Sequence, residues 1–242
     1  MEWQPIAGEY QIAVSNEHGF GTDALVLANF ASPKRGERVL ELGTGCGAIA
    51  LRLCATGRPA SVHGVDIAPA AIALAQMSAK AFAVAGGEPA PTFGVGDWES
   101  PVTLGKGNRY TLVVCNPPYF APGSGAVSAT PADRLSRHEN PGTLPAVCAA
   151  AAAQLQYGGR FCLCHRPERL AAVLAALTAA GLEPKKLQGV QHRPASAPWL
   201  MLVEARLGGR PGLTWLPSLC QENADGSTTA DWQRIYGGYH GE

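Results

Sequence analysis

Short apolar runs of strand length alternate with helical patterns over residues 38–180. The strand-like runs are 38–42, 61–65, 91–95, 110–115 and 160–164, and the helical segments are 48–54, 69–84, 145–155 and 167–180. Strands separated by helices form parallel βαβ units, so the pattern predicts a sheet with helices on both faces. Two extended segments follow at 185–191 and 199–207 with no helix between them, and we expect them to pair antiparallel at one edge. The predicted fold class is therefore α/β.

Length and composition fit one such domain over residues 1–242, because 46% of the residues are hydrophobic and only 16% are charged. We expect an N-terminal segment at 10–36, a core at 37–207 and a C-terminal extension at 208–242 whose structure the pattern does not predict. No apolar run approaches the roughly 18 residues that cross a bilayer, and the first residues lack a secretory signal. We therefore expect a cytoplasmic protein with no membrane partner, and a monomer is favoured.

The seven cysteines form no Cys-x-x-Cys pair, which favours buried thiols in a reducing compartment over a disulfide scaffold. Cys162, Cys164 and His165 could suggest a metal site, but no second ligand pair follows at the spacing of a zinc site. Core packing is the preferred interpretation, and no metal is expected.

Charge is unevenly distributed along a chain whose formal net charge is zero. Residues 134–210 carry 10 Lys and Arg against 4 Asp and Glu. This excess permits a polyanionic partner but does not require one, because solvated surface arginines would give the same count.

A glycine-rich turn follows the first predicted strand, in Glu41-Leu-Gly-Thr-Gly-Cys-Gly47. Glycines at alternate positions let the backbone turn sharply and approach a ligand, and the following helix offers free N–H groups. Asp66 ends the next strand, where a carboxylate can accept both hydroxyls of a ribose or cap the helix that begins near Pro69. Together these residues indicate a nucleoside-containing ligand. They leave open a nicotinamide, S-adenosylmethionine or a structural turn without a ligand.

Asn116-Pro117-Pro118-Tyr119 directly follows the clearest buried strand, 110–115. The prolines fix the backbone and remove two N–H donors, so the Pro117 carbonyl is held as an acceptor beside the Asn116 side-chain oxygen. Two such acceptors can hold an NH2 group, and Tyr119 offers a flat face on which a planar group can stack. The alternative is a rigid turn that ends the strand.

These motifs resemble the class I S-adenosylmethionine-dependent methyltransferases that act on amino groups through an Asn-Pro-Pro-Tyr motif. The resemblance implies a Rossmann-like sheet of seven mostly parallel strands with an antiparallel edge pair. It also implies S-adenosylmethionine as cofactor, with Asn116, Pro117 and Tyr119 at the catalytic centre. The cofactor-binding residues that it implies are Thr22, Glu41, Gly43, Gly45, Gly47, Asp66, Asp97, Trp98 and Asn116. Among these, Asp66 would hold the ribose, and Asp97 and Trp98 would lie at the adenine.

Three further segments narrow the resemblance to one family within this class: Gly19–Ala28, Arg137-His138-Glu139 and His165–Leu170. Over roughly residues 10–207 the chain is similar to the bacterial valine-tRNA adenine methyltransferases. That family implies a tRNA partner and methylation of the adenine 3′ of the anticodon at N6. It places Tyr119, Phe120, Arg137 and His138 at the substrate. Basic residues that could contact the tRNA backbone are Arg134, Arg137, His138, Arg160, Arg166, Arg169, Lys185, Lys186 and Arg193.

Three alternatives remain open at this stage. A release-factor glutamine methyltransferase would present the same NH2 geometry, but those enzymes usually carry an extra helical domain, and only about 37 residues precede the first strand here. A guanine-amine methylator of rRNA more often has Phe in place of Tyr119. A non-catalytic cofactor-binding partner subunit tends to lose the glycines or the asparagine, and both are present here.

Overall fold

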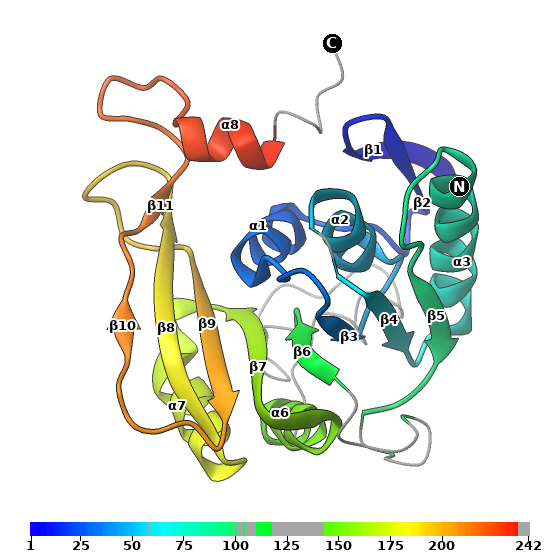
Figure 1. The fold of residues 1–242 in the computed structure, drawn as a ribbon. Coiled ribbons are helices and arrows are strands. Elements are labelled where there is room, and N and C mark those ends of the chain that lie inside the picture. The colour runs from blue at the N-terminus through cyan, green and yellow to red at the C-terminus, as the bar shows by residue number, and fades with distance from the viewer. Residues whose placement is uncertain (58, 99, 101–103, 105–109, 118–142, 237–242) are drawn as a thin grey trace.

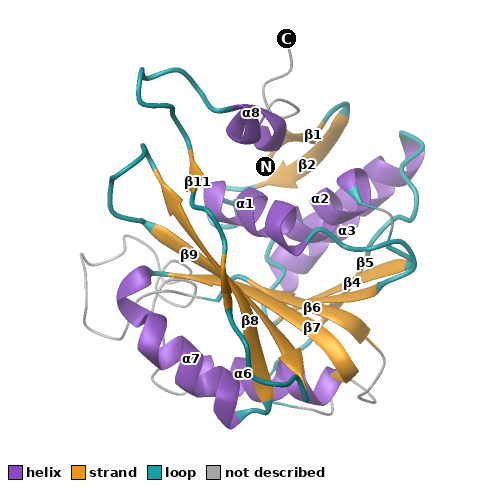
Figure 2. Ribbon diagram, turned by 60° about the vertical axis from the view of Figure 1, so that its left-hand side comes forward, coloured by secondary structure: helices purple, strands orange, loops and turns teal. Residues whose placement is uncertain are grey.

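The computed structural model describes residues 1–57, 59–98, 100, 104, 110–117 and 143–236. In these residues a central sheet is covered by helices on both faces (Figure 1, Figure 2). Its longer strands are β3 (Arg38–Leu42), β4 (Ser61–Asp66), β5 (Thr92–Val95), β6 (Tyr110–Cys115), β7 (Leu155–His165), β8 (Leu182–Gln191) and β9 (Leu200–Leu207). The α/β fold class is confirmed.

The strand order is β8-β9-β7-β6-β3-β4-β5, with the short β10 (Thr214–Trp215) and β11 (Leu219–Cys220) added to the outer side of β8. Strands β5, β4, β3, β6 and β7 are parallel, whereas β9 runs antiparallel to both β7 and β8. All seven predicted strands therefore form, and the antiparallel pair lies at one side of the sheet as expected. The parallel order brings the carboxyl ends of β3, β4 and β6 together.

The helices form two layers. On one face lie α1 (Thr22–Ala31), α2 (Ala48–Thr56) and α3 (Pro69–Val84), and on the other lie α6 (Thr143–Gln154) and α7 (Leu170–Ala179) (Figure 2). A separate apolar core fills each interface. The first core includes Phe82 and Leu51, and the second includes Phe161 and Leu177, all fully buried.

Strand β7 begins earlier than the apolar pattern predicts, at Leu155 rather than Arg160. Gly158 has a φ of 76°, and the register with β6 shifts between Tyr110 and Leu112. The glycine pair thus forms an irregularity within the strand rather than its start, and the preceding helix ends at Gln154.

Both ends of the chain contribute structure that the sequence pattern does not predict. A hairpin of β1 (Glu2–Ala7) and β2 (Tyr10–Val14) packs on α3, where Ala13 N donates to Ser78 Oγ at 2.8 Å. Helix α8 (Ala230–Tyr236) contacts α1 and β11. None of the helices in the described part of the chain is long and apolar enough to cross a membrane.

Candidate active site

The predicted site residues converge because three strands are in register. Leu42 of β3 pairs with Val65 of β4 and with Cys115 of β6. The residues that follow these three are Gly43, Asp66 and Asn116, so they leave the sheet side by side at one carboxyl edge. In open α/β sheets this edge is where ligands bind.

The loop after β3 needs its glycines. Gly43, Gly45 and Gly47 have φ values of 71°, 54° and 90°, a region that costs other residues roughly 1–2 kcal/mol. A Cβ on Gly43 would lie 2.9 Å from the Trp98 ring, and one on Gly47 would lie 2.8 Å from the Phe93 ring. The loop is therefore held close against its neighbours, with α2 beginning directly after Gly47.

Asp66 connects the glycine loop to the loop after β4. Its Oδ2 accepts from Gly45 N at 2.8 Å, and its Oδ1 accepts from Ala68 N at 2.9 Å, just before α3. The carboxylate thus supports the turn before α3 without capping the helix, whose N-cap residue is Ala68, and it also reaches the glycine loop. Each carboxylate oxygen keeps further acceptor capacity for a ligand hydroxyl.

Glu41 lies beneath the loop, with a relative exposure of 1%. Its Oε2 accepts from Thr44 Oγ1 at 2.7 Å and from Ala50 N at 2.9 Å. Burial raises the pKa of Glu41 to about 8, against the lowering effect of these two hydrogen bonds. Glu41 therefore links the glycine loop to the start of α2.

An apolar surface lies beside the loop. Ile67 directly follows Asp66, and Val95 pairs with Asp66 at the end of β5; these two side chains are 58% and 56% exposed. Gly96 N donates to the Asp66 carbonyl at 2.9 Å, which brings Asp97 and Trp98 to the same edge. Sequence reasoning missed Ile67 and Val95, although an apolar residue next to a strand-ending acid was a visible signal.

Asn116 is held by residues from two other elements. Its Nδ2 donates to Asp23 Oδ2 at 3.1 Å, and its Oδ1 accepts from Cys164 Sγ at 3.1 Å. Asp23 lies in the first turn of α1 next to Thr22, and its Oδ1 accepts from Ala24 N at 2.9 Å. Sequence reasoning gave no role to Asp23. It assigned Cys164 to core packing, which its burial confirms, but missed its hydrogen bond to Asn116.

Four predicted substrate-side residues, Tyr119, Phe120, Arg137 and His138, lie outside the described residues. The prediction that Arg160 is a surface residue that contacts the tRNA backbone is wrong. Arg160 is buried and forms ion pairs with Glu37 and Glu204. Within the residues that the structure describes, no group of three or more His, Cys, Asp or Glu side chains could hold a metal ion.

Comparisons with known proteins agree with this arrangement. A structure of a predicted O-methyltransferase from Agrobacterium tumefaciens superposes with a TM-score of 0.73, covering 91% of this chain and 98% of that one at 21% identity, which establishes the fold. Together with the family match given next, this fold places the chain in the class of the S-adenosylmethionine-dependent methyltransferases. The chain belongs to the methyltransferase small domain family, whose model matches residues 15–169.

Two kinds of curated relative are similar to the chain. The tRNA1(Val) (adenine(37)-N6)-methyltransferase of Tolumonas auensis is 27% identical over 213 residues, which cover 85% of this chain and 82% of that protein. The release factor glutamine methyltransferase of Rhodospirillum rubrum is 42% identical over 101 residues, but these cover 41% of this chain and only 29% of that protein.

Proposed function

We propose that the chain transfers a methyl group from S-adenosylmethionine to the exocyclic N6 of an adenine in tRNA, specifically the adenine 3′ of the anticodon in a valine tRNA. The observation that carries the proposal is the position of Asn116 and Pro117, in register with the glycine loop at one edge of the sheet. The length of the match to the tRNA methyltransferase, 82% of that protein, supports the choice of substrate.

The residues at this edge fit the cofactor. The exposed Ile67 and Val95 offer an apolar surface for the adenine, next to Asp97 and Trp98. Asp66 has acceptor capacity for the ribose hydroxyls, and the loop from Gly43 to Gly47 would pass the methionine part, with Thr22 near it. When bound, S-adenosylmethionine supplies an electrophilic methyl group on a sulfonium sulfur.

The chain's own residues hold and orient the amino group. The N6 lone pair of adenine is delocalised into the ring, so the nitrogen is a weak nucleophile. Hydrogen bonds from N6 to Asn116 Oδ1 and to the Pro117 carbonyl favour a pyramidal nitrogen with a localised lone pair. Alignment in such a site contributes up to about 7–11 kcal/mol to lowering a barrier. The released proton passes to water, and Tyr119 provides the face on which the unstacked base lies.

Asp23 and Cys164 set the direction of the Asn116 amide. Because Asp23 accepts from Nδ2, the oxygen of the amide is directed away from Asp23. The thiol of Cys164 is a weak donor to Oδ1 and holds the amide oxygen from the side of β7. We therefore assign Asp23 and Cys164 positioning roles.

The test is transfer from labelled S-adenosylmethionine to bulk unmodified tRNA, followed by digestion and mass spectrometry of the nucleosides. N6-methyladenosine is expected with the wild-type chain and not with Asn116→Ala. Absence of label in tRNA, with the cofactor still bound, would reject the tRNA assignment and leave the methyltransferase class intact.

A second candidate is methylation of a glutamine side chain in a release factor. The 42% identity over 101 residues favours it, and a glutamine amide presents the same NH2 group to Asn116 and Pro117. Release factor protein in the same assay separates the two. Label in the glutamine of the release factor, with none in tRNA, would reject the first proposal in favour of the second. Adding rRNA as a third substrate tests guanine methylation.

A further inference from the structure

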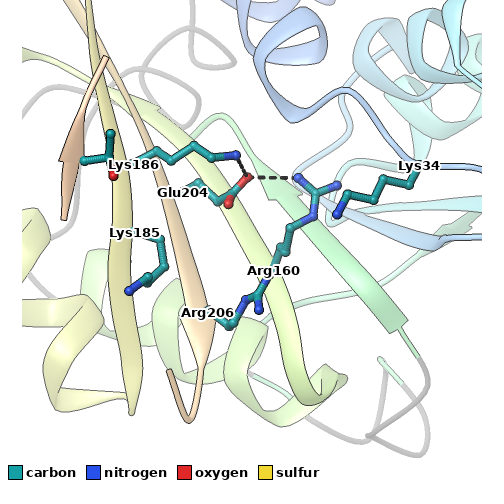
Figure 3. A pocket seen from close by; sticks show the side chains of 7 residues that line it. Lys34, Arg160, Lys185, Lys186, Glu204 and Arg206 are labelled. Atoms are coloured by element: carbon teal, nitrogen blue, oxygen red, sulfur yellow. Dashed lines mark hydrogen bonds and ion pairs between the residues drawn. The ribbon is translucent and has the colours of Figure 1, made fainter. Parts of the chain in front are cut away.

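A cavity of about 300 Å³ lies on the α1 side of the sheet, where β7, β8 and β9 run side by side. Five cationic side chains and one carboxylate line it, from three strands and the segment after α1 (Figure 3). They are Lys34, Arg160, Lys185, Lys186, Arg206 and Glu204, and we call this cavity the basic pocket.

The floor of the basic pocket is a fixed network of charges. Arg160 Nη2 pairs with Glu37 Oε2 at 2.7 Å, and its Nη1 donates to Glu204 Oε2 at 2.9 Å and to the Ala31 carbonyl at 3.2 Å. Lys186 Nζ reaches the same oxygen of Glu204 from the other side at 3.1 Å (Figure 3). Both carboxylates are thus already engaged with cations of the floor and do not neutralise the rest of the pocket.

The three remaining cations have no such ion pair, and the nearest acidic residue in the strand register is Glu183, opposite Arg206. In the described part of the chain, no carboxylate lies within ion-pair distance of Lys34, Lys185 or Arg206. Lys185 Nζ donates to the Arg210 carbonyl at 2.9 Å, which fixes its position without reducing its charge. A concave cluster of like charges concentrates the positive potential and attracts an anion.

The basic pocket is separate from the candidate active site but lies within reach of one polymer. Arg160 pairs with Leu112 of β6, four residues before Asn116, and Lys186 lies three strands away from β6 in the sheet. At about 3.3 Å per residue and about 4.8 Å per strand, the two sites are on the order of 20 Å apart. A small phosphate compound cannot occupy both sites, whereas a folded RNA can.

An exposed aromatic side chain lies next to the basic pocket in the chain. Thr214 of β10 lines the pocket, and the following Trp215 is 66% exposed on the other side of that edge strand. Because successive residues of a strand point to opposite faces, this ring does not line the pocket itself. The choice of RNA over an acidic protein as the polyanion therefore rests on the proposed function and not on this ring.

We propose that the basic pocket binds backbone phosphates of the RNA whose base enters the active site. Lys34, Lys185 and Arg206 contact the phosphates, and the network of Arg160, Glu204 and Lys186 keeps the floor in place. The choice of tRNA as ligand rests on the proposed function. The inference that the pocket binds phosphate groups is independent of the proposed function.

The experiment measures binding of fluorescein-labelled unmodified tRNA to the full chain over a series of salt concentrations. The pocket variant is Lys185→Gln with Arg206→Gln, and Lys34→Gln is a second, independent variant. The control is Lys80→Gln with Arg234→Gln, which removes the same number of exposed cations from α3 and α8. Melting temperature and S-adenosylmethionine binding are measured on every variant.

The pocket variant is expected to bind tRNA about tenfold more weakly and to lower the slope of log affinity against log salt by about 1.5, as for the loss of two phosphate contacts. The control should stay within about twofold of wild type. Equal losses in the pocket and control variants would overturn the proposal, as would unchanged tRNA binding by the pocket variant. Inorganic pyrophosphate binding is measured by calorimetry on the same variants, and a loss confined to pyrophosphate, with tRNA binding unchanged, would overturn the proposal in favour of a small phosphate ligand.

The result is distinguishable from a failure of the proposed function. Weakened tRNA binding by the pocket variant, in a chain that methylates no tRNA, would support the pocket and reject the tRNA methylation. Normal tRNA methylation together with normal tRNA binding by the pocket variant would reject the role of the pocket and support the tRNA methylation.

Discussion

The side chain of Asn116 is fixed at both ends by residues that lie far from it in the sequence. Asp23 is 93 positions upstream and Cys164 is 48 positions downstream, and neither carried a role in the motif. The sequence therefore predicts the reacting groups, because Asn-Pro-Pro-Tyr has a fixed local geometry. It does not predict their supports, because these depend on how α1 and β7 pack against the end of β6.

Replacing Asn116 by alanine tests its role directly. The variant is expected to lose at least about 100-fold in kcat, comparable to the loss of one polar group that stabilises a transition state. Its affinity for S-adenosylmethionine should change by less than about twofold, since the loop and Asp66 are untouched. Single-turnover methylation and calorimetric cofactor binding measure the two quantities. Turnover close to wild type would contradict the mechanism.

Glu41 gives a pH-dependent prediction at the same scale. Its folded pKa of about 8, compared with an ordinary value of 4.5, means that the buried carboxyl is favoured in its neutral form. The preference for the neutral carboxyl stabilises the folded state fully below pH 4.5. The free energy of unfolding then falls as the pH rises to about 8, by at most about 1.4 kcal/mol per pH unit. Glu41→Gln does not titrate, so its stability relative to wild type should rise over that range. Urea unfolding from pH 5 to 9 measures the difference, and parallel curves for the two proteins would contradict it.

The glycine loop is the element whose geometry constrains the site most. Gly43 and Gly45 both have positive φ, but only Gly43 faces a neighbour that a Cβ would strike, the Trp98 ring at 2.9 Å. A Cβ on Gly45 would meet nothing within 4 Å. Alanine substitutions at the two positions therefore distinguish the effect of backbone strain from the effect of the contact with Trp98.

Gly43→Ala is expected to reduce cofactor affinity by more than tenfold, because both the loop and Trp98 must shift. Gly45→Ala carries only the backbone strain of roughly 1–2 kcal/mol and should have the smaller effect. Gly8→Ala, with a φ of 55° in the N-terminal hairpin and open space around it, is the matched control for strain alone. Calorimetric cofactor binding and melting temperature are the measurements. Equal effects of the first two variants would show that Trp98 is irrelevant.

Elements with strong local signals were predicted closely, and those that depend on tertiary pairing were not. Helix α3 at 69–84 and strand β6 at 110–115 have the predicted bounds, because Pro69 and Pro117 mark a start and a stop. Strand β7 begins before its glycine pair, and β1 and β2 lack a clear alternation of polar and apolar residues. Their pairing is set by a neighbouring strand or helix rather than by their own sequence.

On the scale of the whole molecule, one buried arginine joins the two ends of the chain. Arg52 of α2 donates to the carbonyl of Ile6 in β1 and to the carbonyl of Ile235 in α8, and its relative exposure is 4%. Burial lowers the pKa of its guanidinium, against the raising effect of Tyr236. The N-terminal hairpin and the C-terminal helix, neither of which the sequence predicts, thus depend on the same side chain.

Arg52→Met is therefore expected to destabilise the protein globally rather than at one end. It keeps an unbranched apolar side chain but removes the guanidinium donors to both main-chain carbonyls, at about 1–3 kcal/mol each. Arg234→Met is the matched control, because Arg234 lies on the exposed side of α8 and pairs only with Asp231 in the described part of the chain, so its loss should cost within about 0.5 kcal/mol. Urea unfolding gives both values, and hydrogen exchange shows where protection is lost. Loss of protection confined to α8 would mean that Arg52 anchors the helix alone, whereas simultaneous loss in β1 and α8 would establish that the two ends fold as one unit with α2.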